Sequence, residues 1–263
     1  MSRLLRGWWV AVAAAVVAVV LVACGGGGGD SMPSAQSLCN SIGTQPKIYN
    51  GTACGQPEAA SVILLQVATS GGVVTCSGTL ITPTKVLTAA HCLPGGTSQV
   101  MAGAWGADGS LSGVPASGWS VHPGFQRTAS VLVNDAAVVF LSSPLPNTTM
   151  GILLSQPSAK GQQVFIAGWG APSFGLMVGA ATLGLVNDNS VGYSFSGGGS
   201  NTCSGDSGGP AFRSVGGRSG VVGITSSGTA GDCGGKDQSL FTNVQGAAVI
   251  DFIRSQAPDA AYF

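Results

Sequence analysis

Hydrophobic positions along the chain gather in short runs separated by glycine, serine, threonine and proline. The runs cover residues 62–67, 73–75, 79–81, 85–88, 136–141, 164–167 and 221–225. Short runs bounded by turn residues are typical of the strands of a β-sandwich or β-barrel. One stretch differs, because between residues 245 and 255 the apolar residues Ala248, Val249, Phe252 and Ile253 recur at helical spacing. The pattern predicts an all-β domain that ends in a helix.

The first residues have the pattern of an export signal. Arg3 and Arg6 precede an uncharged apolar run over residues 8–22, which is shorter than the roughly 20 residues of a membrane-spanning helix. The run ends in Leu21-Val22-Ala23-Cys24, which resembles the lipobox of bacterial lipoproteins, where the cysteine is acylated after cleavage. The alternative is a signal peptide that merely ends in cysteine. We expect a signal peptide over 1–23, a lipid on Cys24 and a place in the bacterial cell envelope, anchored to a membrane.

Composition limits the partners and the compartment. The formal net charge is zero and 8% of the residues are charged, so there is no electrostatic case for a nucleic-acid partner. Seven cysteines leave one without a partner in an oxidising compartment, and Cys24 is the natural odd one. Sequence alone allows about 15 pairings of the other six. These six are Cys39, Cys54, Cys76, Cys92, Cys203 and Cys233.

Ser207 lies in a segment rich in glycine, at residues 205–210. Glycines let the backbone turn where a Cβ would clash, so the serine can be exposed beside main-chain N–H groups, as a nucleophile requires. A serine hydroxyl also needs a histidine base and a carboxylate that orients it. The Gly-x-Ser-x-Gly pattern matches the nucleophile elbow of α/β-hydrolases too, but there the histidine follows the serine. Both histidines here, His91 and His122, precede Ser207, which excludes that class.

The base and the carboxylate each have a candidate. His91 follows a strand-like run and is followed by Cys92, whose disulfide would hold the loop in place. Asp135 interrupts a hydrophobic stretch, and burying an unpaired carboxylate costs several kcal/mol. An imidazole N–H is a suitable partner for this carboxylate.

Three motifs carry a family resemblance. Thr-Ala-Ala-His-Cys, Asn-Asp-Ala-Ala-Val and Gly-Asp-Ser-Gly-Gly-Pro contain His91, Asp135 and Ser207 in this order, and together they resemble the chymotrypsin/trypsin-like serine protease family over residues 48–263. The resemblance implies two packed six-stranded Greek-key β-barrels with the active site between them and a C-terminal helix. It implies peptide or protein substrates, a triad of His91, Asp135 and Ser207, and an oxyanion hole formed by the N–H groups of Gly205 and Ser207. His122 is interpreted as structural.

The resemblance also implies disulfides and activation by proteolysis. It pairs Cys76 with Cys92 and Cys203 with Cys233, and it leaves Cys39 with Cys54. Cleavage of a zymogen between Lys47 and Ile48 would free an α-ammonium that pairs with Asp206. We therefore expect a lipidated glycine-rich tether and pro-segment over 24–47, a protease domain over 48–263 and a separate activating protease. We expect no cofactor, since no cysteine and histidine spacing suggests zinc and no acidic cluster suggests calcium.

Substrate preference and turnover stay open at this stage. By the resemblance, Asn201 and Ser239 lie near the base of the primary specificity pocket, and Ser226 and Gly228 form its wall. An asparagine at position 201 argues against a preference for lysine or arginine, while the sequence does not decide whether Asp232 or Asp237 reaches the pocket. The alternative function is a silent protease fold that serves as a binding module at the cell surface. Its usual signature is a broken triad, and all three residues are present here.

Overall fold

The computed structural model describes residues 52–53, 60–106, 109–128, 131–173, 175–230 and 233–263, all within one unit, Pro33–Phe263. Several expectations lie outside the described residues. They are the signal peptide over 1–23, Cys24, the tether over 24–47, the cleavage site at Lys47 and Ile48, the Cys39–Cys54 bridge and Asp232.

The described residues are predominantly β-strand. The strands of the first half are β1 (Thr52–Ala53), β2 (Val62–Thr69), β3 (Gly72–Thr82), β4 (Lys85–Thr88), β5 (Thr97–Trp105), β6 (Leu111–Val121), β7 (Gln126–Arg127), β8 (Leu132–Val133) and β9 (Ala137–Leu141). Those of the second half are β10 (Gly151–Ile152), β11 (Gln163–Gly168), β12 (Met177–Thr182), β13 (Leu185–Val186), β14 (Ser190–Phe195), β15 (Pro210–Val215), β16 (Arg218–Ser227) and β17 (Asp237–Asn243). A 3₁₀-helix, η2 (Ala90–Cys92), and an α-helix, α2 (Ala247–Gln256), complete the described elements.

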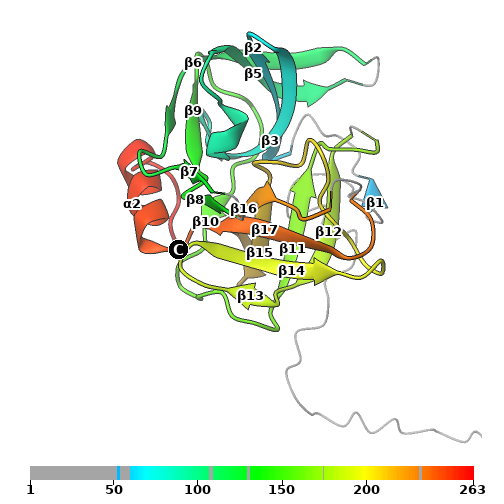
Figure 1. The fold of residues 1–263 in the computed structure, drawn as a ribbon. Coiled ribbons are helices and arrows are strands. Elements are labelled where there is room, and N and C mark those ends of the chain that lie inside the picture. Colours follow the sequence, from blue (N-terminus) through cyan, green and yellow to red (C-terminus); the bar gives the residue numbers. More distant parts are fainter. Residues whose placement is uncertain (1–51, 54–59, 107–108, 129–130, 174, 231–232) are drawn as a thin grey trace, which may run out of the picture. The chain divides into compact units, whose positions relative to one another are not determined.

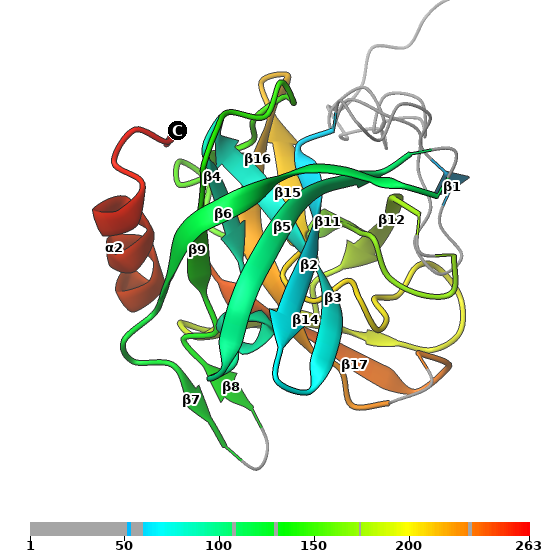
Figure 2. The ribbon, with the colours of Figure 1, turned by 90° about the horizontal axis from the view of Figure 1, so that it is seen from above.

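Six strands close into a barrel in the order β2-β3-β4-β9-β6-β5, seen from above in Figure 2. Every neighbouring pair is antiparallel. Val62, Ile63, Leu64 and Leu65 of β2 are all fully buried. A strand with solvent on one face buries only alternate residues, so both faces of this part of β2 are covered. This explains why the first four residues of β2 are all apolar.

The second sheet contains nine strands in the order β1-β12-β11-β15-β16-β17-β14-β13, with β10 added in parallel to β16. It curls below the barrel in the view of Figure 1. Register shifts at Ala211/Phe212 and Thr225/Ser227 mark β-bulges, which strengthen the local twist. The expected all-β, trypsin-like fold is confirmed, with one closed barrel and one sheet that curls as a half-barrel among the described residues.

The C-terminal helix is also confirmed. Helix α2 buries Val249, Ile250, Phe252 and Ile253, a stripe that repeats at helical spacing. Ala248, expected on this stripe, is exposed, and Ile250 is buried instead. Among the described helices, none is long and apolar enough to cross a membrane.

Candidate active site

His91 lies in η2, directly after strand β4. The next residue, Cys92, forms a disulfide with Cys76 of strand β3. The bridge closes a loop of 16 residues, and in the chain-entropy model a loop of this size stabilises the fold by roughly 3 kcal/mol. The histidine is therefore held on a short helix that is covalently fixed to the barrel.

Asp135 is turned inward by the residue before it. Asn134 adopts a left-handed conformation with φ 53°, which asparagine tolerates better than most residues. The Asn134 side-chain amide donates to the carbonyl of Gly124, and its backbone N–H donates to Oδ1 of Asn189. This turn separates β8 from β9 and leaves Asp135 with no exposed surface.

Three donors converge on the Asp135 carboxylate. The backbone N–H of His91 donates to Oδ1 at 2.8 Å, Nδ1 of His91 lies 2.7 Å from Oδ2, and the Ser226 hydroxyl donates to Oδ2 at 2.6 Å. These bonds offset the cost of burying the carboxylate. Because the carboxylate accepts, Nδ1 of His91 carries the hydrogen and Nε2 keeps a free lone pair. Nε2 is thus available as a base.

Ser207 lies in the loop between β14 and β15, where Gly205 and Gly208 have φ values of 97° and 82°. A Cβ at Gly208 would lie 2.1 Å from Oγ1 of Thr88, so the loop approaches the barrel at a distance that only glycine permits. Sγ of Cys92 lies 4.0 Å from Nε2 of His91 and 3.6 Å from the carbonyl oxygen of Ser207. The histidine and the serine are therefore neighbours of the same sulfur atom. Within the described residues the Ser207 hydroxyl forms no hydrogen bond.

The N–H groups of Gly205 and Ser207 also have no partner among the described residues, and neither has that of the exposed Ser204. Those of Asp206, Gly208 and Gly209 donate to the carbonyls of Cys203, Thr225 and Asp206. The N–H groups of the half-buried Gly205 and Ser207 can therefore donate to a group bound beside Ser207. Two such donors beside a serine can stabilise an oxyanion.

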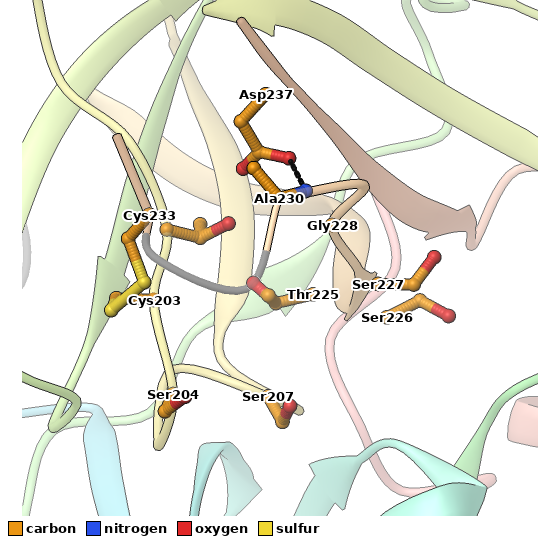
Figure 3. Close-up of a pocket in the computed structure, with 11 residues that line it drawn as sticks. Cys203, Ser204, Ser207, Thr225, Ser226, Ser227, Gly228, Ala230, Cys233 and Asp237 are labelled. Atoms are coloured by element: carbon orange, nitrogen blue, oxygen red, sulfur yellow. Dashed lines mark hydrogen bonds between the residues drawn. A yellow bond between two sulfur atoms is a disulfide. The ribbon is translucent and has the colours of Figure 1, made fainter. Parts of the chain in front are cut away.

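A pocket of about 220 Å³ opens beside Ser207. Figure 3 places Ser207 and Asp237 at opposite ends of this pocket, with the Cys203–Cys233 disulfide on one side and Ser226 and Ser227 on the other. The lining residues are Thr202, Cys203, Ser204, Ser207, Thr225, Ser226, Ser227, Gly228, Ala230, Cys233 and Asp237. Ser226 and Gly228 thus line the pocket, and Ser226 additionally binds Asp135.

Asn201 and Ser239 are fully buried behind the pocket wall. The Asn201 amide donates to Oδ2 of Asp237 at 2.9 Å, and the Ser239 hydroxyl donates to Oδ1 of Asn201 at 2.7 Å. Burial raises the pKa of Asp237, but hydrogen bonds from Asn201 and from the N–H groups of Ala230 and Thr229 outweigh it, so the net pKa lies below its usual value. The pocket therefore contains an ionised carboxylate at neutral pH.

Asp206, which precedes Ser207 in the chain, is the third buried acid of the site and is 1% exposed. Its carboxylate accepts hydrogen bonds from the N–H groups of Gly170 and Cys203, at 2.9 and 2.8 Å. Burial raises the pKa of Asp206 to about 7, despite the two hydrogen bonds. No lysine, arginine or histidine of the described residues forms an ion pair with this carboxyl group.

His122 is placed as a structural residue. Its Nε2 donates to the carbonyl of Ala248, its Nδ1 accepts from the N–H of Gly124, and its ring packs 5.0 Å from the ring of Phe252.

The described residues contain no group of three or more histidine, cysteine, aspartate or glutamate side chains suited to a metal ion.

Three features of the site had no decisive signal in the sequence. The bond from Ser226 to Asp135 joins residues 91 positions apart. The place of Asp237 in the pocket depends on the path of the loop before β17. Ser77, which contacts the nucleophile loop, looks in the sequence like an ordinary small strand residue beside Cys76.

Comparison with known proteins agrees with this architecture. The family model described as "Trypsin" matches residues 48–253. Brachyurin from Leptuca pugilator is 32% identical over 206 residues, which are 69% of this chain and 87% of the relative. Trypsin from Sus scrofa is 31% identical over 188 residues, 62% of this chain and 78% of the relative. A trypsin-like protease from Streptomyces glaucescens is 31% identical over 183 residues, 60% and 65% of the two chains.

The chain belongs to the trypsin family of serine proteases. By this membership it is a serine endopeptidase that acts on peptide bonds.

The raised pKa of Asp206 predicts how stability depends on pH before any cleavage. An aspartate whose pKa is about 7 when folded and 3.8 when unfolded binds more protons in the folded state between these values. The free energy of unfolding of the uncut chain should therefore decrease as pH rises from 3.8 to about 7. Asp206→Asn, which cannot ionise, should lack this component in denaturant titrations across the same range. Parallel pH curves for the two proteins would contradict the prediction.

Proposed function

We propose that this protein hydrolyses peptide bonds through an acyl-enzyme on Ser207, with His91 as general base and acid and Asp135 as the group that orients it. The observation that carries the proposal is the 2.7 Å contact between Nδ1 of His91 and the buried Asp135 carboxylate. This contact fixes the tautomer and leaves Nε2 beside the disulfide that Ser207 also contacts.

Acylation follows from this arrangement. Oγ of Ser207 attacks the substrate carbonyl carbon while its proton passes to Nε2 of His91. The carbonyl oxygen becomes an oxyanion, to which the N–H groups of Gly205 and Ser207 donate. When the intermediate collapses, the C–N bond breaks and the proton on Nε2 passes to the leaving amine.

Deacylation repeats the sequence with water. Nε2 takes a proton from the water molecule as its oxygen attacks the acyl carbon, and then returns a proton to Oγ of Ser207 as the acid product leaves. In both stages His91 becomes positively charged, and the Asp135 carboxylate at 2.7 Å stabilises that charge.

Covalent labelling tests this proposal. The protein should react with a fluorophosphonate probe at Ser207, because the probe needs an activated serine hydroxyl, and Ser207→Ala should not react. Ser143→Ala, an exposed serine that does not line the pocket, is the control and should label like the unmodified protein. Absence of labelling in activated protein would favour the alternative, a silent protease fold that serves as a binding module.

The pocket supports a substrate class. Asp237 brings a negative charge to the end of the pocket opposite Ser207, and its described partners are neutral amides, N–H groups and hydroxyls. Neutral donors stabilise the carboxylate without cancelling its charge, so a cationic side chain in the pocket gains an attraction that an apolar side chain does not. We infer a preference for lysine or arginine before the cleaved bond. Asn201, which argued against this preference in the sequence, holds Asp237 in place.

Substitution of this acid should change the preference. Asp237→Asn should lower kcat/KM for lysine and arginine substrates by about 10- to 100-fold, as expected for loss of a hydrogen bond to a charged group. The kcat/KM for leucine and phenylalanine substrates should change far less. Asp188→Asn, an exposed acid elsewhere, is the control. Equal turnover of basic and apolar substrates by the unmodified enzyme would refute the assignment.

We further propose that the chain is made as a zymogen and cut between Lys47 and Ile48. Two observations support this: the family match begins at residue 48, and the buried Asp206 has no cationic partner among the described residues. An α-ammonium on Ile48 would supply that partner and lower the pKa of Asp206. Because a pocket that prefers lysine would also accept Lys47, there are two candidate activators: a separate protease and an activated copy of this enzyme.

The proposed location is the bacterial cell envelope. The basic start, the apolar run and Leu21-Val22-Ala23-Cys24 support export and a lipid on Cys24. Residues 25–29 are all glycine and would form a flexible tether. A bridge between Cys39 and Cys54 would span the cut and keep the activated domain attached to the lipidated segment.

Substitution at the cleavage site tests activation and tethering together. Lys47→Gln should remain uncut and inactive, because no new amino terminus forms, whereas Lys160→Gln, an exposed control, should mature with Ile48 first. The mature enzyme should stay in the membrane fraction and enter the soluble fraction after reduction or in Cys24→Ser. A fully active, uncut Lys47→Gln protein would exclude the zymogen, and soluble mature enzyme without reductant would exclude the tether.

A further inference from the structure

Ser77 connects the barrel to the nucleophile loop. It lies in β3, has no exposed surface and does not line the pocket. Its backbone N–H donates to the carbonyl of Ser207 at 2.8 Å, and its own carbonyl accepts from the Thr88 hydroxyl at 2.8 Å. The backbone of Ser77 thus already connects the strand that carries Cys76 with the nucleophile.

The side chain of Ser77 adds a second connection. Its hydroxyl accepts from the N–H of Trp169 at 2.9 Å and donates to the carbonyl of Gly205 at 2.8 Å. Because the Trp169 N–H can only donate, the serine oxygen must accept there and direct its hydrogen elsewhere. The direction of the bond to Gly205 is therefore fixed, and the two bonds in series strengthen each other.

Gly205 needs such an external restraint. It has φ 97° and no side chain, so the two peptide groups beside it can rotate more freely than they could beside any other residue type. The peptide group between Ser204 and Gly205 is held through the Ser204 carbonyl, which accepts from the N–H of Ala171 at 2.8 Å. The peptide group between Gly205 and Asp206 is held at both ends. Its N–H, that of Asp206, donates to the carbonyl of Cys203 at 3.0 Å, and its carbonyl, that of Gly205, accepts from the Ser77 hydroxyl. Within the described chain, Ser77 is the one partner of the Gly205 carbonyl.

We propose that Ser77 is a positioning residue for the oxyanion hole: its hydroxyl holds the Gly205 carbonyl and so fixes the Gly205–Asp206 peptide, which connects the donors Gly205 N–H and Ser207 N–H and sets their spacing. This inference rests on the proposed function, in which these two N–H groups are the oxyanion donors. Ser77 lies on the barrel that carries His91, whereas Gly205 lies on the loop that carries Ser207. The hydroxyl therefore also fixes the oxyanion donors relative to the base.

The effect should fall on the transition state. An oxyanion forms only as Ser207 attacks, so a changed spacing of the two N–H donors weakens transition-state binding and leaves the pocket unchanged. Since the Asp206 N–H still restrains the peptide, the loss should be smaller than for removal of a donor. We expect kcat per active site to fall about tenfold, below the 100- to 1000-fold typical of a deleted oxyanion donor.

The experiment compares Ser77→Ala with Ser61→Ala in activated enzyme, with active sites counted by the fluorophosphonate. Ser61 is the matched control, because its hydroxyl, directly before β2, is also buried but has no hydrogen-bond partner among the described residues. Two inhibitors with the same peptide are used, an aldehyde that forms a tetrahedral adduct with Ser207 and the corresponding alcohol that does not. Ser77→Ala should lose kcat and aldehyde affinity by the same factor and retain alcohol affinity, while Ser61→Ala should match the unmodified enzyme.

Three results would overturn the proposal: an unchanged kcat per labelled site, equal losses of aldehyde and alcohol affinity, or the same losses in Ser61→Ala. Failure of the unmodified enzyme to label would instead count against the proposed function. Ser77→Ala leaves the buried N–H of Trp169 without a partner, which destabilises the fold. If that variant does not fold, Ser77→Cys keeps a weaker donor of similar shape. Its ratio of aldehyde to alcohol affinity should lie below that of the unmodified enzyme, and an unchanged ratio would refute the role of the hydroxyl.

Discussion

The site depends on the burial of one carboxylate. Asp135 has no exposed surface, and its charge is tolerated because the N–H and Nδ1 of His91 and the hydroxyl of Ser226 all donate to it. These donors come from η2 of the barrel and from β16 of the curled sheet. The carboxylate is satisfied only when the barrel and the sheet are packed together, so its burial ties the assembly of the fold to the geometry of the base.

The nucleophile loop is fixed mainly through its backbone. The carbonyl of Ser204 accepts from the N–H of Ala171, that of Gly205 from the hydroxyl of Ser77, and that of Ser207 from the N–H of Ser77. The N–H groups of Asp206, Gly208 and Gly209 are also paired. The N–H groups of Gly205 and Ser207 are left without a described partner. A loop restrained through so much of its backbone can hold these two donors in place, so that little reorganisation is needed when negative charge develops beside Ser207.

The pKa values of Asp206 and Asp237, the other two buried acids of the site, are shifted in opposite directions. Asp237 receives an amide, two N–H groups and a hydroxyl, and these bonds outweigh the effect of burial on its pKa. Asp206 receives two N–H groups only, and burial raises its pKa to about 7. Burial thus outweighs the hydrogen bonds at Asp206, whereas the hydrogen bonds outweigh burial at Asp237, so the pocket acid stays ionised.

The sequence by itself determined the all-β class, the C-terminal helix and the three motifs around His91, Asp135 and Ser207, because these follow from local periodicity and from short spacings within motifs. It did not determine that Ser226 binds Asp135, that Asp237 rather than Asn201 brings charge to the pocket, or that Ser77 holds Gly205. These contacts join residues 91, 36 and 128 positions apart. Only tertiary packing brings such residues together, since hydrogen bonding depends on distance and direction in space, which residue type and neighbouring sequence do not specify.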